Sequence, residues 1–192
     1  MFGRRTLRSL LLAFLSTVAA AGCCGAGVSF PPARRCNSPD FQWTIRCVTE
    51  EGLHKLFLSR LAASKEDFIY ATGRSCDVLW SDDSERIAVT DWVGSNGTEI
   101  VLVNVSDPGN GVSLQVKDLA KFVLNEELEG HCYFEALKWE NAQRLLIRVF
   151  GHTDENPSHG FAYYFSVDTT SGVPRLVKKV NAEPSMPRHY PP

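Results

Sequence analysis

Two stretches of the sequence follow the same plan, and this repetition limits the fold more than any other feature. Residues 76–107 begin CDVLWSDDSERIAV, and residues 132–168 begin CYFEALKWENAQRLLI. In each, an apolar strand ends in Trp and is followed by a polar turn, an Arg with a second apolar strand, a loop and a third strand. We therefore expect two antiparallel three-stranded meanders, each with a Trp that closes the end of its core.

The first stretch resembles a blade of the TolB and WD-repeat β-propellers, in which Trp-Ser-x-Asp-Ser and a following hydrophobic strand recur. The matching letters are WSDDSERIAV, residues 80–89, whereas the segment around Trp139 keeps the pattern but not the letters. Two units cannot close a propeller, which needs about four to eight blades. The sequence therefore predicts a mainly β domain of antiparallel meanders, sandwich-like or incomplete-propeller-like. One helix, over residues 116–128 with Asp118 as its N-cap, is expected on its side.

The N-terminal residues 1–22 are predicted to be a secretory signal peptide. Arg4, Arg5 and Arg8 precede a short apolar run and a series of small residues, and no acidic residue occurs among them. The apolar run is too short to cross a bilayer. The sequence AAGC, which ends at Cys23, resembles the lipobox of bacterial lipoproteins, apart from Ala20 where Leu is usual. Lipidation of Cys23 and simple cleavage both remain open.

The rest of the chain divides into three parts. Residues 23–40 are predicted to be a tether, residues 41–182 a β-rich domain, and the proline-rich residues 183–192 a disordered tail. Loss of residues 1–22 would change the net charge from −2 to −5. A mildly acidic exported domain of this kind is not expected to bind nucleic acid, and no segment is long enough for a transmembrane helix.

Four cysteines follow the expected cleavage region: Cys36, Cys47, Cys76 and Cys132. In an exported protein an even number of dispersed cysteines indicates disulfides rather than a metal site. Four cysteines allow three connectivities, and the sequence does not choose among them. Our working prediction pairs Cys36 with Cys47 and Cys76 with Cys132.

One loop carries residues that could ligate a metal ion. His152, Asp154 and His159 lie within eight residues, but Asn, Pro, Ser and Gly among and beside them are typical of an exposed hairpin loop. We favour the loop interpretation and expect neither a cofactor nor a catalytic residue. A metal-dependent hydrolase that uses this loop is the alternative.

Aromatic residues are concentrated in the second meander. Tyr133, Tyr163 and Phe165 could pair across strands, or could form an aromatic surface for a partner. We expect an exported envelope protein, in the periplasm or held at the membrane by a lipid, that binds a protein or cell-wall partner without catalysis.

Overall fold

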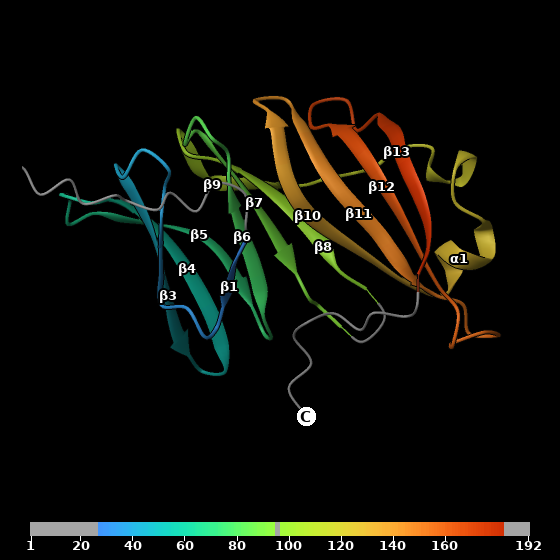
Figure 1. Ribbon diagram of the computed structural model, residues 1–192. Helices are drawn as coiled ribbons and strands as arrows, with labels where there is room; N and C mark the ends of the chain where they lie inside the picture. The colour runs from blue at the N-terminus through green and yellow to red at the C-terminus, as the bar shows by residue number, and fades with distance from the viewer. Residues whose placement is uncertain (1–26, 95–96, 183–192) are drawn as a thin grey trace, which may run out of the picture.

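The computed structural model describes residues 27–94 and 97–182, which form three antiparallel sheets and little helix (Figure 1). The mainly β prediction is therefore confirmed. The first sheet has the order β2-β3-β4-β5, with β2 Arg35–Asn37, β3 Trp43–Glu50, β4 Leu53–Arg60 and β5 Glu66–Thr72. The second has the order β1-β6-β7-β8-β9, with β1 Val28–Phe30, β6 Cys76–Trp80, β7 Arg86–Asp91, β8 Glu99–Asn104 and β9 Asp107–Ser113. The third has the order β10-β11-β12-β13, with β10 His131–Asn141, β11 Arg144–His152, β12 Gly160–Asp168 and β13 Pro174–Ala182.

The second sheet lies between the other two and contributes to two separate cores. Successive side chains of a strand point to opposite faces. Ile87 and Val89 therefore enter the first core with the side chains of the first sheet, whereas Ala88 enters the second core with those of the third. This arrangement explains why β7 is buried on both faces and reads as an almost continuous apolar run.

The two tryptophans of the repeated pattern close these cores as predicted. Trp80 packs in the first core, and Trp139 packs in the second, where it is 3% exposed. The indole Nε1 of Trp139 donates a hydrogen bond to the carbonyl oxygen of Leu79 over 3.3 Å. The third sheet is therefore joined to the second through Trp139, which lies near the end of its own first strand.

The first sheet is a third copy of the same unit. Its β2–β3 turn carries a hydrogen bond of 2.6 Å from Ser38 Oγ to Asp40 Oδ1, and the β6–β7 turn carries the same bond from Ser81 to Asp83. In both turns the serine Oγ also accepts from the backbone N–H five residues later. Three tandem four-stranded meanders thus stack face to face, and the fold resembles part of a β-propeller.

Part of the expected tether belongs to the fold. Residues 28–30 and 35–37 form β1 and β2, and β1 pairs with β6 so that Phe30 lies opposite Cys76. The side chain of Phe30 is completely buried in the first core. The prediction of a tether is wrong here because three-residue strands among Pro and Gly give no alternating pattern.

The predicted helix over residues 116–128 is broken in two. A 3-10 turn, η1 Leu119–Lys121, precedes the short helix α1 Asn125–Glu129. Asp118 lies at the start of η1 with φ 55°, in the left-handed region, and its side chain forms no capping hydrogen bond. The backbone at Leu124 is extended, and its N–H donates to Glu127 Oε2 over 3.1 Å.

The structure does not support the predicted disulfides, because Cys47, Cys76 and Cys132 are free thiols. Cys76 and Cys132 face different cores, on opposite sides of the second sheet, which separates that predicted pair. Cys36 lies opposite Ile45 in the β2–β3 register, so Cys47 is displaced from it by two residues. The predicted signal peptide, the lipid acceptor Cys23 and the tail at 183–192 lie outside the described residues.

Candidate functional site

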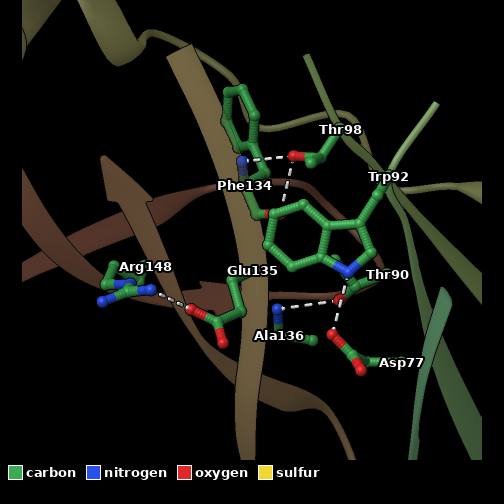
Figure 2. A network of polar contacts seen from close by, with 8 residues as sticks. All are labelled: Asp77, Thr90, Trp92, Thr98, Phe134, Glu135, Ala136 and Arg148. Atoms are coloured by element: carbon green, nitrogen blue, oxygen red, sulfur yellow. Dashed lines mark hydrogen bonds and ion pairs between the residues drawn. The ribbon is translucent and has the colours of Figure 1, made fainter. Parts of the chain in front are cut away.

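The seam between the second and third sheets is closed at one end by side chains from β7 and the following loop (Figure 2). Thr98 Oγ1 donates to the carbonyl oxygen of Phe134 over 2.7 Å and also accepts from the N–H of the same residue. Thr90 Oγ1 accepts from the N–H of Ala136 over 3.1 Å. Because these groups belong to the edge strand β10, the two threonines satisfy backbone atoms that no neighbouring strand pairs.

Trp92 completes this closed end. Its ring packs with Tyr133 and Phe150, and its Nε1 donates to Asp77 Oδ2 over 2.9 Å. Figure 2 shows the indole across β10, with its nitrogen directed toward Asp77. Arg148 and Glu135 form an ion pair of 2.6 Å beside it. Arg148 Nε is buried without a hydrogen-bond partner among the described residues, whereas the other polar groups named here are paired, as expected of a structural junction.

The opposite end of the same seam is open and forms a hollow of about 430 Å³. We call it the A–C hollow, where A stands for the second sheet and C for the third. Its position follows from the β7–β8 register: Asp91 pairs with Glu99 at the closed end, and Arg86 pairs with Asn104 at the open end. The lining residues are Arg86, Leu102, Val103, Asn104, Asn110, Val112, Ser113, Leu114, Gln115, Lys117, Trp139, Thr169, Thr170, Ser171 and Gly172.

A tight contact holds two walls of the A–C hollow together. The N–H of Lys117 donates to the carbonyl oxygen of Gly172 over 2.9 Å. Gly172 has φ 73°, and a Cβ atom there would lie 2.1 Å from the carbonyl oxygen of Gln115. Only glycine fits this position. Asp168 fixes the same turn by accepting from the N–H and Oγ of Ser171, both over 2.8 Å, and these bonds lower its pKa.

The charge inside the A–C hollow is positive. Arg86 and Lys117 line it, and no Asp or Glu does. Within residues 27–94 and 97–182, neither cation forms an ion pair. By contrast Arg144, at the equivalent position of the third sheet, donates from Nε to Ser166 Oγ over 2.9 Å. The arginine of the second repeat unit is therefore left available to a ligand.

A second, larger hollow of about 890 Å³ contains two of the predicted metal-ligating residues, Asp154 and His159. His159 Nδ1 lies 2.8 Å from Asn156 Oδ1 within the exposed loop, and the Asp154 side chain is 78% exposed. His152 stacks instead on His131, with ring centroids 4.5 Å apart. In the part of the chain that the structure describes, no three His, Cys, Asp or Glu side chains are grouped to hold a metal ion.

The structure places the three aromatic residues of the second meander in the interior, which favours cross-strand pairing over a binding surface. Tyr133, Tyr163 and Phe165 are all buried, with Phe165 fully so. Tyr163 and Phe165 face the second core, where the Tyr163 hydroxyl donates to Glu127 Oε2 over 2.7 Å. Burial and this hydrogen bond raise the pKa of Tyr163. The alternation of Tyr163 and Phe165 on β12 indicated that they share one face of a sheet, but not whether that face would be buried in a core.

The residues of the A–C hollow were not singled out from the sequence. Arg86 belongs to the repeated pattern, but Lys117 lies in the segment predicted to be helical. The useful signal is the pair Arg86 and Asn104, which cross-strand register places on one face of the second sheet. That register becomes known only when the β7–β8 hairpin is paired.

The fold and this site together define a three-meander β domain with a cationic hollow at a sheet–sheet seam. No protein-family model matches the chain, and no curated protein matches it in sequence. Among solved structures, a prolyl endopeptidase is similar over 80% of this chain and 28% of its own, with TM-score 0.42 and 15% identity. TolB from Acinetobacter baumannii is similar over 79% of this chain and 43% of its own, with TM-score 0.36 and 14% identity. The chain spans less than half the length of either structure.

The described residues contain no helix long and apolar enough to cross a membrane.

Proposed function

We propose that this chain is a binding module and that the A–C hollow is its ligand site. The observation that carries the proposal is the pair Arg86 and Lys117, two cations in one hollow without an ion-pair partner among the described residues. The hollow is within the usual volume range of small-molecule sites, roughly 300–1,000 Å³. Its walls are held by backbone contacts, so the site is formed before a ligand arrives.

Methyl NMR of the full chain tests the site directly. Leu102, Val112 and Leu114 line the A–C hollow, whereas Leu61 is exposed and directly follows β4 in the first sheet. A library of neutral, cationic and anionic small molecules should yield binders that shift the first three methyl groups and leave Leu61 unchanged. A library whose binders shift only Leu61 or residues of the second, larger hollow, or that yields no binder at the A–C hollow, would overturn the proposal.

We further propose that the module acts outside the cytoplasm, in the periplasm or anchored to the envelope by lipid at Cys23. The basic start and short apolar run of residues 1–22 support export. The partner in that compartment would be an envelope protein or a cell-wall component. Intact mass of the protein isolated from membranes tests this: a chain beginning at Cys23 with added acyl groups supports the anchor. A cytosolic chain that still begins at Met1 would contradict export.

A further inference from the structure

The A–C hollow combines positive charge with several neutral polar side chains. Amide and hydroxyl side chains surround Arg86 and Lys117: Asn104, Asn110, Ser113, Gln115, Thr169, Thr170 and Ser171. Amides and hydroxyls can both donate and accept hydrogen bonds, which suits a ligand that carries many hydroxyl groups. An apolar floor of Leu102 and Leu114 suits the C–H face of such a ligand.

The cations come from two different walls, so that one charged group can contact both. Arg86 begins β7, and its neighbour Ile87 faces the first core, so strand alternation directs Arg86 toward the third sheet. Lys117 belongs to the segment that the Gly172 contact holds against the β12–β13 turn. Arginine is suited to planar, two-point contact with carboxylate or phosphate, and lysine supplies a mobile point charge.

The nearby carboxylates lie outside the hollow and, among the described residues, form no ion pair with Arg86 or Lys117. Asp168 is occupied by the donors of its own turn, and Asp107 accepts two bonds of 2.9 Å from Asn110 Nδ2. Asp83 accepts from Ser81 Oγ, which lowers its pKa, and the charge of Arg86 adds to the effect. None of these three acids lines the hollow.

From this arrangement we infer that the A–C hollow binds an acidic saccharide, in which a carboxylate or phosphate group lies between Arg86 and Lys117. The sugar hydroxyls then contact the amide and hydroxyl side chains of the rim. This inference rests on the proposed function, because it assigns a ligand class to the same hollow. The volume of about 430 Å³ fits one or two sugar rings rather than a folded partner.

Titration with three related sugars tests the inference on the full chain. D-Glucuronate carries a carboxylate, D-glucose 6-phosphate carries a phosphate, and D-glucose carries neither. We expect one or both anions to shift the Leu102 and Leu114 methyl signals with a Kd at least about tenfold lower than that of glucose, as a charge-assisted contact predicts. The affinity should also fall as the salt concentration rises. Comparison of the two anions shows which acidic group the site prefers.

Matched charge variants identify the residues. Arg86→Gln and Lys117→Gln should each raise the Kd of the preferred anion about tenfold and leave that of glucose almost unchanged. Lys65→Gln makes the same change of charge at an exposed site on the first sheet, where the side chain is 83% exposed, and should have no effect. Because Lys117 is exposed, its substitution tests the site even if Arg86→Gln impairs folding.

The experiments distinguish a failure of the acidic-saccharide assignment from a failure of the proposed binding function. Equal binding of glucose and both anions at the hollow would overturn the acidic ligand class and preserve the binding site. Loss of anion binding in Lys65→Gln to the same extent as in Lys117→Gln would also overturn it, because the effect would then be one of net charge. Binding of other small molecules at the hollow, with none of the three sugars, would overturn the saccharide assignment alone. Absence of every binder would overturn the proposed function as well.

Discussion

At the scale of single residues, the glycines that matter are those whose missing side chain lets two backbones meet. Gly151 on β11 lies opposite Cys132 on β10, next to the stacked imidazoles of His131 and His152. A Cβ atom at Gly151 would lie 1.6 Å from the carbonyl oxygen of His131. The obstructing atom belongs to the backbone of a paired strand, so it cannot move aside without distorting the ladder.

Gly151→Ala should therefore destabilise the protein by about 2–4 kcal/mol, the range of a substitution that forces the backbone to shift. Gly109→Ala is the matched control, because no atom lies within 4 Å of the position its Cβ would occupy. Its effect should stay within about 0.5 kcal/mol. Urea unfolding of both variants measures the difference, and equal stability of the two would contradict the close approach at Gly151.

The buried thiols predict how stability depends on alkaline pH. Burial raises the pKa of Cys132 to about 12, from an ordinary value of 9.0, so the folded state keeps its proton after the unfolded state has lost it. Unfolding then releases a proton above pH 9, and stability falls as the pH rises from about 9 toward 12. At pH 10 the loss relative to pH 7 should be about 1–2 kcal/mol for this thiol.

Urea unfolding at pH 7 and pH 10, with a reductant that keeps the thiols from oxidation, measures this effect. Cys132→Ala removes the titrating group and should reduce the difference between the two pH values. Val149→Ala truncates another side chain of the same core without removing a thiol. It should lower stability equally at both pH values. A pH difference that is the same in Cys132→Ala and the parent protein would show that this thiol does not control it.

At the scale of elements, sequence pattern predicted the long strands and missed the short or irregular ones. β7 and β8 are rich in β-branched residues, and they lie where the repeated pattern places them. β9, with sequence DPGNGVS, has the composition of a loop and is a strand only because β8 pairs with it. The third repeat unit was missed because its turn, Ser38-Pro-Asp40, lies inside the expected tether.

The candidate site was less predictable than the strands. The A–C hollow joins β7 and β8 to residues 113–117 and to the β12–β13 turn, which are far apart in the chain. No local periodicity encodes such a juxtaposition. Conversely, the loop residues His152, Asp154 and His159 were close in sequence, yet register directs His152 to His131 on the neighbouring strand.

The hydrogen bonds of Thr98 at the junction between β10 and the second sheet can be tested by comparison with Thr44 on β3. Thr98→Val removes the hydroxyl that bonds both the N–H and the carbonyl oxygen of Phe134. It should cost about 1–3 kcal/mol, because partly buried backbone groups lose their partner. The hydroxyl of Thr44 is buried without a hydrogen-bond partner among the described residues. Thr44→Val should therefore leave stability unchanged or raise it.

Thermal and urea unfolding of the two valine variants provide the comparison. The substitutions are chemically identical, so differences in β propensity between threonine and valine largely cancel. If Thr44→Val proved as destabilising as Thr98→Val, the cost would arise from packing rather than from the edge-strand hydrogen bonds. Hydrogen exchange should also become faster at the Phe134 amide in Thr98→Val alone.

At the scale of the whole molecule, the second sheet makes the two cores dependent on each other. Ala88 and Val89 are adjacent on β7, yet one belongs to the second core and the other to the first. A loss of order in either core therefore leaves one face of β7 without its packing partners. Burial of apolar surface on both faces stabilises the same strand, β7. We therefore expect the three sheets to unfold in one cooperative transition.

Two truncations test this coupling, one in each core. Leu56 packs in the first core and Leu145 in the second, and both are completely buried. Leu56→Ala and Leu145→Ala should each cost about 2–5 kcal/mol and shift a single transition. In both variants, hydrogen exchange in β4 and in β11 should accelerate together, since the opening of one sheet exposes the other. Leu61→Ala, at a side chain that is 49% exposed, should change stability by less than about 0.5 kcal/mol. Two separate transitions, each sensitive to only one of the buried truncations, would show instead that the sheets fold as independent units and that the shared strand does not couple them.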